Sequence, residues 1–304
     1  MSVPIAEQRV HRRVYTSERV TTTEPSSVED TTIQATDRYP LAATVYRPAA
    51  SNETVAVINS ATAVPRQFYR SYALALAARG FTVLTYDYRG IGGSKPTDLR
   101  GFDATMSDWV FSDMGGALRW ANDQWLPRTV VIGHSFGGQT PGLLENGQSI
   151  DAMLTLSAQS GHWRVQGGSQ RLPVWLHTHA TLPVLSHLVG YMPWSWLGSA
   201  EDLPKGVALQ WSAWCRNRYY LLDDPSLPTE RYHAFRAPIR AYSIADDNWG
   251  SEASVDEMMA AYPNVERRHI ELPTNGVEKL GHFGYFRAAA APLWEADFDW
   301  LRSA

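Results

Sequence analysis

The sequence contains 304 residues, of which 44% are hydrophobic and 19% are charged. This composition is that of a globular protein, and it excludes a disordered chain, a collagen-like repeat and a coiled coil. The formal net charge of -4 provides no broad positive field, so we expect no nucleic-acid partner.

Cysteine usage and the apolar segments predict the compartment. The only cysteine, Cys215, cannot form an intramolecular disulfide. The N-terminal segment mixes arginines with glutamates and lacks the apolar core of a signal peptide. Prolines and histidines interrupt the uncharged run 172–200, which predicts buried or lid-forming helices instead of a membrane span. We therefore expect a cytoplasmic protein with no stable membrane insertion.

Alternating strands and helices define the first part of the chain. Residues 1–28 are polar and are expected to form an N-terminal arm. Two β-rich runs around a turn at 37–40 predict an antiparallel hairpin. The elements expected next are strands at 54–59, 81–86, 129–133 and 152–156, with helices at 68–79, at 107–122 and after 135. This order predicts an α/β fold, with a mostly parallel sheet covered by helices on both faces and ligands at the carboxyl ends of the strands.

The alternation pauses over residues 161–237. It resumes with a strand at 239–244, a helix at 254–262, a strand at 265–272 and a final helix from about 292. We interpret 161–237 as an inserted helical lid, and 29–160 with 238–304 as the core. Six of the twelve tryptophans fall in this segment, so it is expected to bury aromatic surface over the sheet.

A G-x-S-x-G pentapeptide, Gly133–Gly137, directly follows one predicted strand and precedes a helix. The glycines suit a strand-to-helix turn that is too sharp for side chains, and the turn projects Ser135 Oγ into the cleft. This context predicts that Ser135 is a nucleophile.

A serine nucleophile requires a histidine base and a carboxylate that orients the histidine. His282 lies in a glycine-flanked loop after the last predicted strand, and Asp246 and Asp247 follow the strand at 239–244. The order Ser, Asp, His is one that such triads use. The residues alone leave Asp246 and Asp247 both open.

A tetrahedral intermediate needs two backbone N–H donors. One is expected from Phe136, directly after the nucleophile, and the other from the loop after Asn59. Thr62 is the candidate second donor, and Ala61 and Ala63 remain alternatives because backbone donors leave no side-chain signature.

With these residues in order, the chain resembles the α/β-hydrolase superfamily over about residues 30–304. The stretch 87–94, Asp-Tyr-Arg-Gly-Ile-Gly-Gly-Ser, is similar to a structural D-x-R-G-x-G-x-S loop of that superfamily. Segments 60–69, 211–216 and 281–286 look like those of a poorly characterised bacterial group of serine hydrolases. The resemblance implies an α/β-hydrolase fold and a Ser-Asp-His triad.

Two segments refine or limit this resemblance. Residues 243–251 are similar to the acid loop of homoserine O-acetyltransferases, S-x-x-x-D-x-x-x-P, which favours Asp247 but has Ser251 in place of the proline. The usual His-Gly before the oxyanion loop is replaced by Ser60-Ala61.

The leading hypothesis is a serine hydrolase that cleaves carboxylic esters of hydrophobic or aromatic small molecules through an acyl-enzyme. Few charged groups in the tryptophan-rich segment could pair with a charged substrate. An acyltransferase, or a hydrolase of amides, thioesters or carbon–carbon bonds, would use the same triad. A non-catalytic binding protein is the remaining alternative. We expect no cofactor and no metal, and leave a homodimer open.

Overall fold

The computed structural model describes residues 25–304 apart from 125, 197 and 199–200. Its central sheet consists of the strands β1 (Ser27–Gln34), β2 (Pro40–Arg47), β3 (Thr54–Asn59), β4 (Thr82–Tyr86), β5 (Arg128–His134), β6 (Ala152–Leu156), β9 (Ile239–Ile244) and β10 (Val265–Ile270). The eight strands lie in the order β1-β2-β4-β3-β5-β6-β9-β10. β2 is antiparallel to both of its neighbours, and all other pairs are parallel. The predicted mostly parallel α/β sheet is therefore confirmed.

The predicted hairpin is β1 and β2. β1 begins at Ser27, so it takes in the end of the predicted N-terminal arm. Residues 1–24 of that arm lie outside the described residues.

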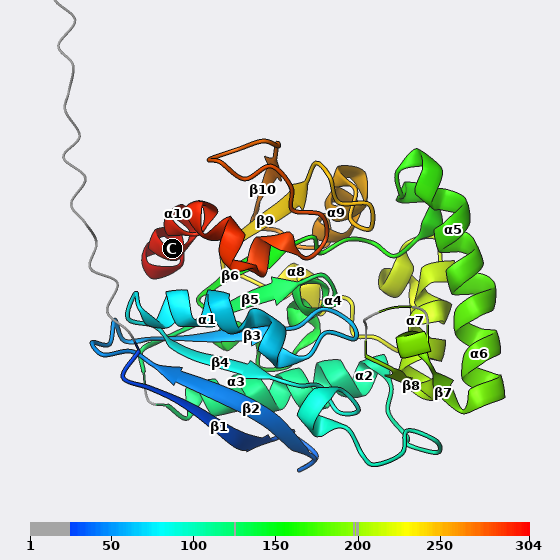
Figure 1. The fold of residues 1–304 in the computed structure, drawn as a ribbon, viewed down its shortest axis with the longest axis horizontal. Coiled ribbons are helices and arrows are strands. Elements are labelled where there is room, and N and C mark those ends of the chain that lie inside the picture. Colours follow the sequence, from blue (N-terminus) through cyan, green and yellow to red (C-terminus); the bar gives the residue numbers. More distant parts are fainter. Residues whose placement is uncertain (1–24, 125, 197, 199–200) are drawn as a thin grey trace, which may run out of the picture.

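Helices cover both faces of the sheet (Figure 1). One face carries α1 (Arg70–Ala77) and α10 (Glu295–Ser303), and the other carries α3 (Gly115–Asn122). α2 (Met106–Asp108) and a π-helical stretch, η3 (Trp109–Met114), precede α3, and α9 (Glu252–Met259) packs beside β9. Successive residues of β3 alternate between the two cores, as its buried, period-two geometry requires.

The helix expected after Ser135 is short. α4 (Phe136–Gln139) ends just before a 3-10 turn, η4 (Pro141–Leu143). Pro141 has no N–H to continue the α-helical hydrogen bonding, which explains why the helix stops there.

Most of the β6–β9 segment, residues 161–237, lies beyond the carboxyl ends of the parallel strands, whereas its last part, 231–237, packs beside η4 and leads back to the start of β9 (Figure 1). It contains α5 (Arg171–Leu176), the π-helical η8 (His177–Thr181), α6 (Leu182–Val189), α7 (Lys205–Arg216), α8 (Arg231–Ala234) and the strand pair β7 (Tyr191–Met192) and β8 (Leu203–Pro204). Its tryptophans are only partly covered, since Trp214 is buried but Trp196 is 68% exposed. No helix among the described residues combines the length and apolarity needed to cross a bilayer.

Candidate active site

The turn at residues 133–137, here the Ser135 turn, holds an uncommon backbone conformation at the end of β5. Ser135 has φ +51° and ψ -119°. A Cβ on Gly133 would lie 2.3 Å from Gly138 Cα, and one on Gly137 would lie 2.2 Å from the Asn59 carbonyl oxygen. Side chains are therefore excluded at both glycines, and the strained turn presents Ser135 at the carboxyl edge of the sheet.

Asp247 and His282 form a direct pair. His282 Nδ1 lies 2.8 Å from Asp247 Oδ2. Asp247 Oδ1 accepts the N–H groups of Trp249 at 2.8 Å and Gly250 at 2.9 Å. Burial raises the pKa of Asp247, but the charge and hydrogen bond of His282 outweigh burial and lower that pKa to about 2. Asp247 is therefore ionised and can orient the imidazole ring.

Asp246 holds the loop that carries His282. Its carboxylate accepts the N–H groups of Leu280 at 3.0 Å and Gly281 at 2.7 Å. Gly281 has φ +55°, which favours glycine. The two neighbouring carboxylates thus have separate contacts, because Asp246 binds the backbone before His282 and Asp247 binds its ring.

Ser135 contacts a residue that the sequence did not single out. Ser135 Oγ lies 3.4 Å from Gln159 Oε1. Within the described residues no hydrogen bond joins Ser135 Oγ to the His282 ring. Hydrogen bonds between catalytic groups often tighten only in the substrate complex. The structure therefore pairs His282 with Asp247, whereas Ser135 contacts Gln159.

The three candidate donors in the loop after β3 differ in their contacts. The Ala61 N–H donates to Tyr69 Oη at 2.8 Å and is already occupied. Thr62 lines the same cavity as Ser135 and Phe136, whereas Ala63 does not. Among the described residues, the N–H groups of Thr62 and Phe136 have no protein acceptor. This arrangement favours Thr62 and Phe136 as the oxyanion donors.

A chain of hydrogen bonds links three loops at this edge. Tyr69 Oη lies 2.8 Å from His134 Nδ1, and His134 Nε2 lies 2.8 Å from the His282 carbonyl oxygen. Because that carbonyl can only accept, Nε2 carries the His134 proton and Nδ1 accepts from Tyr69. Burial, and then the charge of His282, lower the pKa of His134 to about 3, so the ring is neutral.

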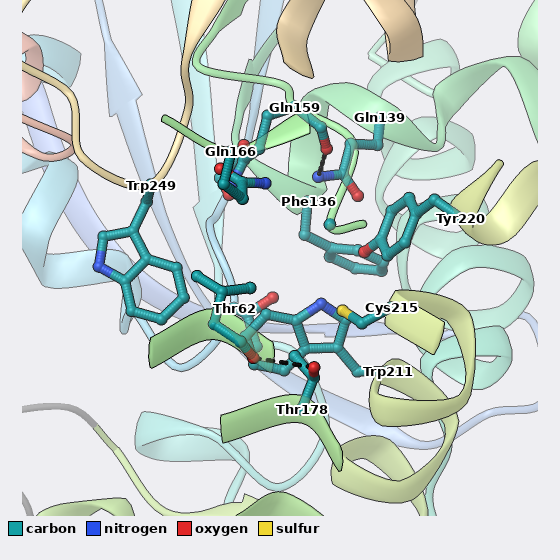
Figure 2. A pocket seen from close by; sticks show the side chains of 13 residues that line it. Thr62, Phe136, Gln139, Gln159, Gln166, Thr178, Trp211, Cys215, Tyr220 and Trp249 are labelled. Atoms are coloured by element: carbon teal, nitrogen blue, oxygen red, sulfur yellow. Dashed lines mark hydrogen bonds between the residues drawn. The ribbon is translucent and has the colours of Figure 1, made fainter. Parts of the chain in front are cut away.

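Ser135 opens on a cavity of about 20 Å³, which has room for about one water molecule. Both the core and the β6–β9 segment line it (Figure 2). The lining residues are Thr62, Ser135, Phe136, Gln139, Gln159, Gly161, Gln166, Val174, Thr178, Trp211, Cys215, Tyr220 and Trp249. None of these side chains is a carboxylate, a lysine or an arginine, so the cavity is neutral.

Cys215 is a neutral thiol in this wall, because burial raises its pKa. In the part of the chain that the structure describes, no three side chains of histidine, cysteine, aspartate or glutamate gather as a metal site would require. The polar side chains of the cavity are therefore amides, hydroxyls, two indole N–H groups and one neutral thiol.

Sequence reasoning missed the glutamines of this cavity. Gln159 had a usable signal, because it follows β6 at the carboxyl edge where ligands bind in such sheets. Gln139 and Gln166 had none, because each is an ordinary polar residue until the fold brings it to Ser135.

Comparisons with known proteins agree with this architecture. A sequence model of the alpha/beta hydrolase family matches residues 56–292. No curated protein sequence matches the chain. Among solved structures, an esterase from Pyrococcus furiosus has a TM-score of 0.57 at 14% identity and covers 97% of this chain and 94% of its own.

Two further esterase structures are similar. One, from Exiguobacterium antarcticum, has a TM-score of 0.62 at 15% identity, over 90% of this chain and 100% of its own. The other, from Thermogutta terrifontis, has a TM-score of 0.56 at 14% identity, over 90% of this chain and 98% of its own. At such identities the likeness shows the fold alone.

Proposed function

Because the chain belongs to the alpha/beta hydrolase family, we propose that it hydrolyses carboxylic esters of small hydrophobic or aromatic molecules through an acyl-enzyme on Ser135. The observation that carries this proposal is the 2.8 Å hydrogen bond between His282 Nδ1 and Asp247 Oδ2, at the same edge of the sheet as the Ser135 turn. Family membership alone does not fix a function, so the proposal depends on these side chains.

Ser135, His282 and Asp247 would form the acyl-enzyme in two proton transfers. Ser135 Oγ attacks the ester carbonyl carbon as its proton passes to His282 Nε2, and Asp247 stabilises the imidazolium. The N–H groups of Phe136 and Thr62 stabilise the charge on the former carbonyl oxygen. His282 then protonates the leaving alkoxide, and the alcohol departs.

Water completes the cycle. His282 removes a proton from water as the water oxygen adds to the acyl carbon, and Ser135 leaves and recovers the proton. The products are a carboxylic acid and an alcohol. The same triad would serve amides, thioesters, carbon–carbon bonds or another acyl acceptor, and the esterases with similar folds support the ester class.

The β6–β9 segment would act as a lid over the core formed by residues 29–160 and 238–304. It contributes Trp211, Val174 and Tyr220 to a wall that favours an apolar or aromatic substrate. The cavity is smaller than an ester, so we expect the segment to move when a substrate binds.

A fluorophosphonate probe tests the nucleophile before any substrate is known. The wild type, Ser135→Ala and His282→Ala are incubated with the probe, and intact mass and peptide mapping locate the adduct. We expect one adduct on Ser135 in the wild type, none in Ser135→Ala and much slower labelling in His282→Ala. No labelling of folded wild-type protein would contradict the proposal and favour a binding role. Added alcohol that yields a new ester would instead indicate acyl transfer.

A further inference from the structure

Three buried glutamines surround the cavity at Ser135. Gln139 lies on α4, Gln159 follows β6, and Gln166 lies at the start of the β6–β9 segment. Gln139 is only 3% exposed and Gln166 only 4% exposed. Figure 2 shows Gln139 and Gln159 side by side, with Gln166 across the cavity from Tyr220. Glutamine is seldom so deeply buried without hydrogen-bond partners for its polar atoms.

Backbone contacts fix the orientation of two of these amides. Gln139 Nε2 donates to the Gln159 carbonyl oxygen at 2.7 Å, and Gln166 Nε2 donates to the Ser160 carbonyl oxygen at 2.9 Å. A carbonyl can only accept, so the nitrogen of each amide must face it. The remaining atom of each amide is therefore an acceptor, Oε1.

Both of these acceptors lack a donor. Gln139 Oε1 and Gln166 Oε1 are buried and have no hydrogen-bond partner among the described residues. A buried acceptor that remains unpaired has lost its hydrogen bonds to water without replacement, which destabilises the folded protein. Both side chains line the cavity, so a ligand that enters it could supply the missing donors. The geometry calls for a ligand that donates.

We propose that Gln139 and Gln166 recognise hydroxyl or N–H groups on the part of the substrate that enters this cavity. The preferred ester is then an apolar or aromatic molecule that carries a neutral hydrogen-bond donor, and not a plain hydrocarbon. A neutral donor fits better than an ammonium group, because no carboxylate lines the cavity. This inference rests on the proposed function of Ser135.

The cavity should discriminate against esters that lack a hydrogen-bond donor more strongly than an apolar cavity discriminates against esters that carry one. An apolar pocket hardly rejects an added hydroxyl, whereas a pocket with buried acceptors rejects a substrate that leaves them unpaired. We expect a preference of at least about 10-fold in kcat/KM for the hydroxylated member of a matched ester pair.

Two isosteric pairs test this preference on both sides of the ester bond. On the acyl side, p-nitrophenyl 6-hydroxyhexanoate is compared with p-nitrophenyl heptanoate. On the alcohol side, the phenolic acetate of 4-(hydroxymethyl)phenol is compared with that of 4-ethylphenol. In the wild type we expect the hydroxylated ester to be preferred in at least one pair. In Gln139→Met and Gln166→Met, which keep the side-chain length but lack the acceptor, that preference should fall toward unity.

Gln148→Met is the matched control. The Gln148 amide also donates to a backbone carbonyl, that of Ala234, but Gln148 is exposed and outside the cavity. Its preference should equal that of the wild type.

The outcomes separate this inference from the proposed function. An active wild type that shows no preference for the hydroxylated ester in either pair would overturn the inference alone. A preference that survives in both methionine variants would overturn the role of these glutamines. A folded wild type that cleaves no ester and takes no fluorophosphonate would overturn the proposed function, and this inference with it.

Discussion

Tyr69 Oη lies 2.8 Å from His134 Nδ1, and this contact joins the loop after β3 to the Ser135 turn. On one side Tyr69 accepts the Ala61 N–H, and on the other His134 donates to the His282 carbonyl. One chain of hydrogen bonds therefore holds the loop after β3, which carries the proposed oxyanion donor Thr62, the Ser135 turn and the loop that carries His282.

Tyr69→Phe removes the centre of this chain. The Ala61 N–H and His134 Nδ1 both lose a buried partner, so we expect the free energy of unfolding to fall by about 1–3 kcal/mol. We also expect kcat to fall by about 10-fold or more, because the oxyanion loop is no longer anchored. Urea unfolding and hydrolysis of p-nitrophenyl acetate measure the two effects.

Tyr72→Phe provides the control for that variant. Tyr72 is equally buried, but its hydroxyl has no hydrogen-bond partner in the described part of the chain. Its removal should leave kcat unchanged and leave stability equal or higher. Equal losses in the two variants would contradict the account of the hydrogen-bond chain.

Substitutions of the two adjacent carboxylates, Asp246 and Asp247, should reduce kcat to very different extents. Asp247→Asn removes the charge beside His282 Nδ1, and we expect kcat to fall by about 10⁴-fold. Asp246→Ala removes two hydrogen bonds to the histidine loop, and we expect a fall of about 10-fold with a lower melting temperature. Steady-state kinetics with one ester rank the two, and the reverse ranking would contradict the assignment.

The strands were the most predictable part of the fold. β3 and β9 begin and end at the predicted residues, because a short continuous apolar run identifies a strand buried on both faces. A helix was predicted at 107–122, but residues 109–114 in its first half form the π-helical η3, and no spacing of apolar residues marks such a widening. Pro141 offered a usable signal for the short α4, since a proline cannot continue the hydrogen bonding of a helix.

The site residues were predictable only where a short local motif identifies them. Ser135 stands in a glycine-flanked motif at the end of β5, and His282 stands in a glycine-flanked loop after β10. The sequence displays both motifs directly. Asp246 and Asp247 are adjacent and carry the same carboxyl group, so the sequence does not tell which of them reaches the His282 ring. Their contacts differ because the folded loop points the two side chains in different directions. The glutamines come from separate elements, and their convergence is a tertiary property.

His134 should make stability depend on pH in a defined window. Its pKa is lowered from 6.5 to about 3 in the folded chain. Below pH 6.5 the unfolded chain binds a proton that the folded chain does not, so stability falls as the pH decreases toward 3, by about 1.4 kcal/mol per pH unit. Asp247, with a pKa lowered from 3.8 to about 2, loses its stabilising contribution only below about pH 4.

His134→Asn tests this window, because asparagine does not titrate. Urea unfolding at pH 7, 6, 5 and 4.5 gives, for each protein, the slope of the free energy of unfolding against pH. At pH 7 the wild type should have a larger free energy of unfolding than His134→Asn. This difference should shrink by about 1.4 kcal/mol per pH unit below pH 6.5. Parallel slopes would contradict a neutral buried His134.

Gly137→Ala should disrupt the Ser135 turn, because the new Cβ would lie 2.2 Å from the Asn59 carbonyl oxygen, which belongs to the backbone. We expect a loss of about 3 kcal/mol or more in unfolding free energy and no fluorophosphonate labelling. Gly168→Ala is the control, since no atom lies within 4 Å of its added Cβ. If the two alanine variants unfolded and labelled alike, the steric account of the turn would be wrong.

Acid-quenched mass spectrometry during turnover of a p-nitrophenyl ester shows directly whether an acyl-enzyme forms on Ser135. We expect a transient mass increase equal to one acyl group, mapped to the peptide that contains Ser135 and absent in Ser135→Ala. Turnover with no acyl adduct under conditions in which nitrophenol is released in a burst, or an adduct on another residue, would contradict it.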